Sequence, residues 1–250
     1  MKTSKSSQPK AINILILAAA KLPVKDGEPG YPVCLTEINN ETLLERIIVN
    51  TKSISNAKFV YCFLKSEVQK YHLDKVVSLF PIDADTVFIP EQTKGSACTA
   101  LLAACQLDQN AELLIISANE LVDDDLGARI SDFRNRGLDA GTLTFHSVHP
   151  RYSFVSLNEE KLVIEAAQRK PISSHATTGI FWFARTADFL DGTQNLIRKG
   201  FCLDGSYFVA PVFNELILKQ MKIGVSPINP ENYYPLKSEH QIEHYESRSK

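Results

Sequence analysis

The stretch Ile14-Leu15-Ile16-Leu17-Ala18-Ala19-Ala20-Lys21 decides the fold, because it is an apolar run that ends in three small residues. The apolar part is typical of a buried parallel strand, and it is far shorter than the ~20 residues that a membrane-spanning helix needs. Glycine and proline are frequent in the segment that follows, 22–32. Small residues after a strand let backbone N–H groups approach a ligand. We therefore expect a ligand-binding loop at 18–25.

Short β-rich runs alternate with helix-like segments along the rest of the chain. Strands are expected at 12–17, 58–64, 86–89, 113–117, 141–146 and 179–183, and helices at 41–54, 97–106, 124–136, 186–199 and 207–220. This alternation predicts an α/β fold of the Rossmann-like type, with a mixed, mostly parallel sheet flanked by helices. Extended runs at 153–157, 162–166 and 180–183 predict a small antiparallel subregion in the second half.

The domain organisation expected is a single domain over 11–236, with one half at about 11–140 and the other at about 141–236. Residues 1–10 are basic and polar and are expected to form a disordered lead, and 237–250 are expected to form a charged tail outside the core. Tyr233 and Tyr234 are expected to anchor that tail at the surface.

Composition and charge narrow the class of protein. The chain has 250 residues, of which 44% are hydrophobic and 22% charged, as in ordinary soluble globular proteins. Its net charge of -2 gives no basic excess, so nucleic acid is not an expected partner. The five cysteines include no C-x-x-C pair and are expected to be reduced thiols in the cytoplasm. Residues 1–20 also follow the order of a secretory signal, but the strand interpretation explains the loop as well.

A second ligand-binding segment is expected at 91–100, between a strand and an alanine-rich helix. Gly95 permits close backbone approach, and Ser96 is expected to cap the helix N-terminus, which favours anions. Gln92 is able to read the edge of a base. The alternative is that the segment only caps the helix.

Four carboxylates follow the buried strand at 113–117. Glu120 is nearest to the strand end and is the candidate ligand for Mg²⁺, which prefers hard oxygen ligands. Asp123, Asp124 and Asp125 are interpreted as caps of the following helix.

The order of these segments resembles the sugar-nucleotide pyrophosphorylases, which are nucleotidyltransferases of the glycosyltransferase-A type of fold. Their pattern runs L-A-A-G-x-G-x-R, P-K-x-L, G-T-A-x-A, G-D, E-K and T-G-I-Y-x-F, and the counterparts here are 17–21, 32–35, 95–99, 119–120, 168–169 and 178–183. The resemblance extends from residue 13 to about 236. Segments 30–32, 149–153, 172–179 and 207–216 also resemble a bacterial branch associated with capsule and surface-polysaccharide biosynthesis.

The chain departs from this pattern at five points, the last of which is a pair of residues. Ala20 replaces the loop glycine, the arginine after it is missing, Val33 replaces a lysine, Glu120 replaces the metal-binding aspartate, and Gln168-Arg169 replaces Glu-Lys. Glu120 keeps a carboxylate and Arg169 keeps a cation. Val33 cannot neutralise phosphate charge, so Lys21, Lys25 or Lys94 is expected to do so.

The resemblance implies transfer of a nucleoside monophosphate from a nucleoside triphosphate, with CTP slightly favoured, to a phosphorylated small molecule or sugar phosphate. It implies that Lys21 and Arg169 are catalytic and that Glu120 holds Mg²⁺. The implied nucleotide-binding residues are Leu17, Ala18, Ala19, Ala20, Lys25, Gln92, Gly95, Ser96 and Ala97. The implied acceptor-binding residues are Ser153, Gln168, Thr178, Gly179, Tyr207 and Asn214.

Two other functions stay open at this point. A glycosyltransferase of the same fold would need a donor-sugar metal motif such as Asp-x-Asp, which Asp123-Asp124-Asp125 spells. The second alternative is a non-catalytic nucleotide-binding homologue, and the five departures from the signature are consistent with it. Membrane insertion is not expected, and a homodimer is left open.

Overall fold

The structure is a computed structural model that describes residues 10–20, 31–38 and 40–248. The predicted catalytic Lys21, the predicted nucleotide-binding Lys25 and most of the predicted disordered lead lie outside the described residues.

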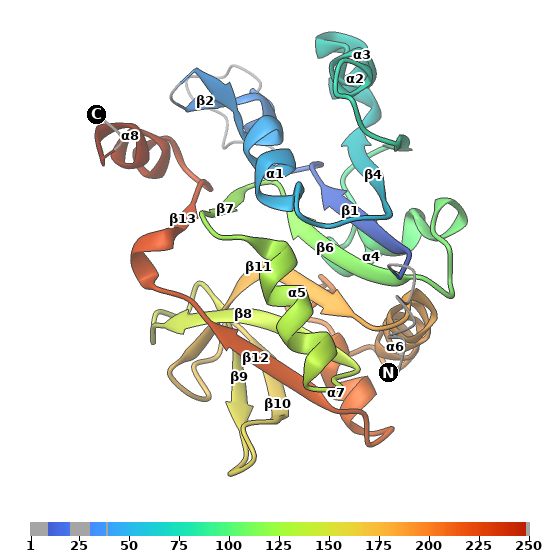
Figure 1. Cartoon of the computed structure of the whole chain (residues 1–250), viewed down its shortest axis with the longest axis vertical. Coiled ribbons are helices and arrows are strands. Elements are labelled where there is room, and N and C mark those ends of the chain that lie inside the picture. Colours follow the sequence, from blue (N-terminus) through green and yellow to red (C-terminus); the bar gives the residue numbers. More distant parts are fainter. Residues whose placement is uncertain (1–9, 21–30, 39, 249–250) are drawn as a thin grey trace, which may run out of the picture.

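The quoted stretch forms strand β1 (Ile12–Leu17), and all six of its residues are buried. It lies between β4 (Ala57–Leu64) and β6 (Glu112–Ser117) and is parallel to both (Figure 1). Strand β5 (Ala84–Ile89) pairs in parallel with β4. The chain runs outward from β1 to β4 and β5 and then crosses back to β6. The carboxyl ends of β1 and β6 therefore form a topological switch point, where open α/β sheets bind ligands.

The second half of the chain extends the same sheet. Strand β11 (His175–Phe183) pairs antiparallel with β6, β8 (Ala140–His146) and β9 (Ser153–Leu157). Outside these, β10 (Val163–Gln168) pairs with β9, and β12 (Ile223–Pro227) pairs with β8, which makes one nine-stranded sheet. The predicted α/β fold is confirmed. The predicted antiparallel strands are also present, and they continue the main sheet rather than forming a separate one.

Helices cover both faces of the sheet because successive residues of its strands point to opposite sides. Ile12, Ile14 and Ile16 belong to a core shared with α1 (Leu43–Thr51) and α5 (Leu126–Asn135). Leu15 and Leu17 belong to a second core, shared with α4 (Ser96–Leu102), α6 (Thr186–Arg198) and α7 (Val212–Ile217). Figure 1 shows α1 and α5 together on the near side of the sheet.

Short elements complete the fold. They are η1 (Val33–Leu35), β2 (Glu37–Ile38), β3 (Glu41–Thr42), α2 (Lys65–Tyr71), α3 (Leu73–Ser78), η2 (Ala104–Gln106), β7 (Glu120–Val122), η3 (Pro230–Asn232), β13 (Tyr233–Pro235) and α8 (Glu239–Arg248). Strand β13 pairs with β7, which brings the C-terminal segment to the residues that follow β6. No helix in the described ranges is long and apolar enough to cross a membrane.

Three predicted helices differ in their bounds by more than two residues at an end. The helix expected at 97–106 is α4, which ends at Leu102 and is followed by the short helix η2. Helix α1 begins at Leu43 rather than 41, because Thr42 and Glu45 form a capping box that fixes the N-terminus. The helix expected at 207–220 is shortened to α7. Pro211 precedes its first residue, and a proline restricts the residue before it to extended conformations.

The C-terminal segment is also different from the prediction. It was expected to lie outside the core, but it forms α8, and Ile242 and Tyr245 pack into the core with α1 and α5. Tyr233, expected at the surface, is only 6% exposed.

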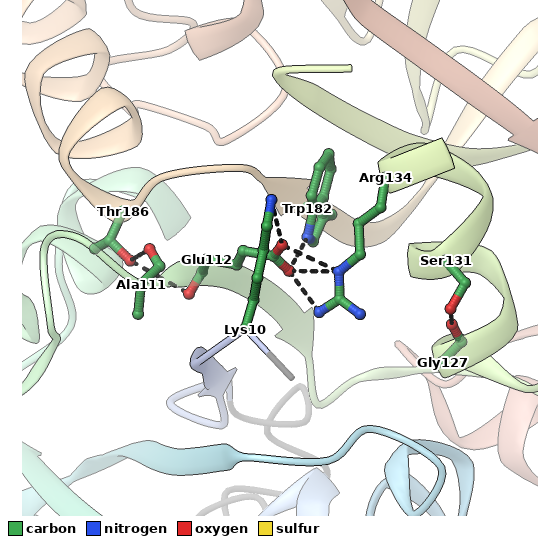
Figure 2. A network of polar contacts seen from close by, with 8 residues as sticks. All are labelled: Lys10, Ala111, Glu112, Gly127, Ser131, Arg134, Trp182 and Thr186. Atoms are coloured by element: carbon green, nitrogen blue, oxygen red, sulfur yellow. Dashed lines mark hydrogen bonds and ion pairs between the residues drawn. The ribbon is translucent and has the colours of Figure 1, made fainter. Parts of the chain in front are cut away.

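A buried ionic network lies at the opposite end of β6 from the switch point. The carboxylate of Glu112, which is 2% exposed, accepts hydrogen bonds from the guanidinium of Arg134 at 2.7–3.0 Å and from the indole N–H of Trp182 at 3.1 Å (Figure 2). Lys10 approaches the same carboxylate at 3.9 Å. Because Arg134 is on α5 and Trp182 is on β11, the network ties both halves of the chain to β6.

Candidate active site

Two adjoining cavities lie at the carboxyl ends of the parallel strands. The small cavity, of about 410 Å³, is bounded by the segments that follow β1, β5 and β6. The large cavity, of about 710 Å³, is bounded by β9, the end of β10, β11 and the segment between β13 and α8. Ser96, Ser117, Asn119, Arg169 and Phe208 line both of them. The two cavities therefore meet at the switch point.

Most of the predicted nucleotide-binding residues that the structure describes line the small cavity. These are Leu17, Ala19, Ala20, Gln92, Gly95 and Ser96. Ala18 and Ala97 are buried instead, and their amides are occupied: Ala18 N–H donates to Cys62 O at 3.0 Å and Ala97 N–H donates to Tyr207 O at 3.1 Å. The structure thus brings this set together except for the two residues whose backbone groups already have partners.

The structure explains why residue 95 is a glycine, which the sequence alone did not reveal. Its φ is +98°, and a Cβ here would stand 2.2 Å from Tyr207 O. The amide of Tyr207 donates to Lys94 O, so the backbone of residue 207 braces the loop before α4. Gly95 also takes the N-cap position expected for Ser96, which is the first residue of the helix and lines the cavity.

Arg169 stands where the two cavities meet. It has a positive φ of 54°, and its amide donates to Tyr152 O at 2.9 Å, which fixes its backbone at the end of β10. Its guanidinium lies over the ring of Phe208, 5.9 Å from the centroid, and 3.4 Å from the exposed carboxylate of Asp204. Half of its side chain stays exposed. The predicted catalytic cation therefore borders both cavities.

Glu120 is held by three donors. Its Oε2 accepts from the amide of Gly179 at 2.7 Å and from the hydroxyl of Tyr233 at 2.6 Å, and its Oε1 is 2.5 Å from Lys237 Nζ. A side chain at Gly179 would stand 3.0 Å from the Glu120 carboxyl carbon and 2.7 Å from Ser117 Cβ, so only glycine admits this arrangement. No cluster of three or more His, Cys, Asp or Glu suited to a metal ion occurs among the described residues.

The electrostatics of this cluster keep Tyr233 protonated. Burial, reinforced by the nearby negative charge of Glu120, raises the pKa of Tyr233 well above its usual value, so its hydroxyl is a lasting donor to the carboxylate. Burial also raises the pKa of Tyr152, against the opposing positive charges of Arg151 and Lys237. The positive charges of Arg151 and Lys237 therefore both favour the ionised form of the Tyr152 phenol, although burial outweighs them.

The predicted acceptor-binding residues divide into two groups. Four of them line the large cavity: Ser153, Gln168, Thr178 and Gly179. Ser153 Oγ and Gln168 Oε1 are 2.5 Å apart, which joins β9 to β10 at the cavity wall. The other two do not line it. Tyr207 braces the loop at 94–97, and Asn214 pairs with both backbone groups of Ala166 on β10.

Sequence reasoning did not single out Arg151, Lys237, Thr177 or Phe208, which also line the large cavity. Arg151 lies in a His-Pro-Arg-Tyr segment that the family resemblance already marked, which was a usable signal. The sequence around Lys237 gave no such signal, because only the pairing of β13 with β7 brings Lys237 to Glu120.

The three aspartates after β7 are engaged away from both cavities. The Asp125 carboxylate accepts from the amides of Gly127 and Ala128 and caps α5, as predicted. Asp124 pairs with Arg129 at 2.5 Å, and Asp123 lies 3.7 Å from Arg46. The Asp123-Asp124-Asp125 segment, which matches the Asp-x-Asp motif in sequence, is therefore not part of the site.

Three solved structures resemble this chain over nearly its whole length. A nucleoside-diphosphate-sugar pyrophosphorylase from Vibrio cholerae superposes with a TM-score of 0.80 over 93% of this chain and 99% of its own, at 18% identity. The chain has the nucleotidyltransferase fold. A Bacillus anthracis protein described as a glucose-1-phosphate thymidylyltransferase, in complex with sucrose, gives 0.75 over 96% and 95%, at 15% identity. The inositol-1-phosphate CTP transferase of T. maritima gives 0.74 over 97% of both chains, at 14% identity.

Sequence comparison adds nothing to this likeness. No family model matches the chain, and no curated protein matches it. The predicted resemblance to the sugar-nucleotide pyrophosphorylases is confirmed at the level of the fold.

Proposed function

We propose that the chain is a nucleotidyltransferase that moves a nucleoside monophosphate from a nucleoside triphosphate to a phosphorylated small molecule or sugar phosphate and releases pyrophosphate. The observation that carries the proposal is the position of Arg169, a cation at the junction of two cavities at the switch point. The two cavities offer separate space for a nucleotide and an acceptor, and three structures described as nucleotidyltransferases or pyrophosphorylases share the fold over nearly the whole chain.

The reaction needs alignment and charge neutralisation more than proton transfer. An oxygen of the acceptor phosphate attacks the α-phosphorus, a new P–O bond forms, and the bond to the bridging oxygen breaks so that pyrophosphate leaves with its electron pair. The acceptor phosphate is already ionised, so no general base is required. Gln92, Gly95 and Ser96 would hold the nucleotide in the small cavity, and Arg169 would neutralise charge between the two phosphates.

The resemblance also implied a divalent metal, which neutralises phosphate charge in related chemistry. The described residues at Glu120 do not fit that role, because Lys237, Tyr233 and Gly179 already occupy the carboxylate. The expected Mg²⁺ site at Glu120 is therefore not formed, and no step is assigned to a metal there. Lys21 and Lys25, the predicted phosphate cations, belong to the undescribed segment at 21–30.

The finer assignment belongs to this proposal as well. CTP is slightly favoured by the resemblance to enzymes with small acceptors, and one of the three structures is a CTP transferase. A role in capsule or surface-polysaccharide biosynthesis is supported by the resemblance of segments 30–32, 149–153, 172–179 and 207–216 to a bacterial branch of the family. A cytoplasmic location is supported by the five cysteines, which include no C-x-x-C pair.

The test is release of pyrophosphate from each common nucleoside triphosphate in the presence of glucose 1-phosphate or inositol 1-phosphate, with the product followed by ³¹P NMR. Arg169→Ala should raise the acceptor KM far more than the nucleotide KM, with Arg169→Lys intermediate, because a planar fork contacts two oxygens at once. Lys219→Gln is the matched control, since Lys219 pairs with Asp191 away from both cavities. Unchanged constants in an active Arg169→Ala preparation would place the acceptor site elsewhere.

A non-catalytic nucleotide-binding protein is the second candidate, and one observation favours it. Val33, where the signature has a lysine, is 3% exposed in η1, so it supplies no charge to either cavity. Calorimetric binding of a nucleoside triphosphate without pyrophosphate release from any acceptor would select this candidate.

A further inference from the structure

We propose that Lys237 stands in for a metal ion at Glu120, and that Lys237 and Arg151 bind the anionic group of a phosphorylated ligand in the large cavity. The inference rests on the proposed function for the class of ligand. It assigns a role to two cations that the sequence pattern of the family does not contain.

The carboxylate of Glu120 is already neutralised. Its two oxygens receive an ammonium, a phenol and a backbone amide, all at 2.5–2.7 Å. A dication at the same oxygens would stand beside the positive charge of Lys237, and the two would repel each other. Asp123 and Asp124, the other carboxylates nearby in the sequence, are paired with arginines and do not line the cavity. Among the described residues that line the large cavity, Glu120 is the only carboxylate, so no second carboxylate is available there to a metal.

The same contacts hold Lys237 in place. The Glu120 carboxylate accepts hydrogen bonds from Gly179 on β11 and from Tyr233 on β13. Its position is therefore fixed by two elements of the fold. Lys237 lies two residues after the end of β13, lines the large cavity and keeps 39% of its side chain exposed. An ammonium carries three donors, and the ion pair with Glu120 leaves donors for a ligand.

Arg151 is a second cation held at the cavity wall. Its guanidinium lies 5.6 Å from the centroid of the Tyr152 ring and contacts the ring nitrogens of His149 at 3.2–3.3 Å. Among the described residues it forms no ion pair with a carboxylate. A planar guanidinium with free N–H groups suits a phosphate, which it can contact through two oxygens.

An unpaired buried hydroxyl points to the same place. Thr177 lines the large cavity, is 4% exposed, and its Oγ1 has no hydrogen-bond partner among the described residues. Buried hydroxyls are normally satisfied, so an orphan in a cavity wall indicates a ligand that completes it. A phosphate or sugar oxygen is such a partner.

The first test uses Mn²⁺ alone as the probe, followed by its effect on water-proton relaxation. We expect wild type and Glu120→Gln to give the same Mn²⁺ titration, because Lys237 occupies the carboxylate. A binding site present in wild type and lost in Glu120→Gln would overturn the proposal. This test needs no substrate and no activity.

The second test measures binding of glucose 1-phosphate and of inorganic phosphate by calorimetry, once with EDTA and once with Mg²⁺. We expect wild-type Kd values that agree within about twofold in the two buffers. Lys237→Gln and Arg151→Gln should each raise Kd by about tenfold, the loss expected for one charge-assisted contact, and Lys237→Arg should recover part of it. Lys219→Gln should leave Kd unchanged. Binding that requires Mg²⁺ and ignores Lys237→Gln would overturn the proposal.

The results separate this inference from the proposed function. Metal-independent binding of a phosphate that depends on Lys237, without nucleotidyl transfer, upholds the inference and contradicts the function. Pyrophosphate release by wild type with an undiminished rate in Lys237→Gln upholds the function and contradicts the inference. Thermal unfolding of each variant, compared with wild type, confirms that the folded protein is being measured.

Discussion

Gly179 shows how one residue sets the geometry of the site. Its amide donates to Glu120, and its missing side chain leaves room for Ser117 on the neighbouring strand β6. A glycine in a strand interior often marks a close approach of this kind. The sequence indicated Gly179 as an acceptor contact, whereas the structure gives it the further task of admitting a carboxylate.

We expect Gly179→Ala to destabilise the protein by about 1–3 kcal/mol, the usual cost of an inserted methyl group in a packed interior. The added Cβ would lie 2.7 Å from Ser117 Cβ and 3.0 Å from the Glu120 carboxyl carbon. Denaturant unfolding measures the loss. The double variant Gly179→Ala/Ser117→Gly removes the nearest obstruction and should regain part of the stability. Equal stability of the single variant and wild type would contradict this steric account.

At the scale of single residues, the sequence indicated those cavity-lining residues whose position depends on local structure. Leu17 is the last residue of β1, Gln92 and Ser96 follow the end of β5, and strand ends meet at one edge of a parallel sheet. Lys237 and Tyr233 could not be predicted this way. They reach Glu120 across more than a hundred residues of sequence through the pairing of β13 with β7, which has no local signal.

At the scale of elements, caps decided which predicted bounds held. Asp125 and Gly137 mark the ends of α5 as expected. Helices α2 and α3 were not predicted, because helices of seven and six residues have little intrinsic stability and depend on packing. Val68, Leu73 and Val77 supply that packing in the core below β4.

We expect Asp125→Ala to cost about 1 kcal/mol at neutral pH, because it removes the N-cap of α5. A hydrogen bond from Ser53, together with the amides of Ala128 and Gly127, lowers the pKa of Asp125 below its ordinary value of 3.8. Its stabilising effect is therefore complete above the unfolded-state pKa and is lost as the pH falls through the lower folded-state pKa.

Urea unfolding of wild type and Asp125→Ala at a series of pH values measures this. The difference between the two proteins should be constant from neutral pH down to about pH 5 and should shrink in acid. Asp125→Asn, which keeps a neutral cap, is the control. A difference that stays constant into strong acid would show that the charge of Asp125 has no part in the cap.

At the scale of the whole molecule, one sheet runs through both halves of the chain. Strand β6 pairs with β1 of the first half and with β11 of the second, so the two halves share the main sheet. The sequence predicted the two halves from a change of pattern near residue 141. It could not show that the antiparallel strands would join the parallel ones, since register between distant strands depends on tertiary packing.

Variants of Glu112 test whether the shared sheet couples the two halves. Glu112 links β6 to α5 and β11 at the end of the molecule remote from the cavities (Figure 2). Glu112→Ala leaves Arg134 and the Trp182 indole without their shared acceptor, and we expect a loss of at least about 2 kcal/mol. For a chain of this size that corresponds to a fall in Tm of about 4–8 °C.

The form of the transition carries the stronger prediction. Because both halves depend on β6, scanning calorimetry of Glu112→Ala should show one transition at lower temperature, with a calorimetric enthalpy equal to the van't Hoff enthalpy. Glu112→Gln keeps an acceptor for Trp182 and should lie between wild type and Glu112→Ala in Tm. Two separate transitions would mean that the halves unfold independently and that β6 does not couple them. The nucleotide binding that we propose at the remote cavities should survive in the folded variant, since Glu112 lines neither of them.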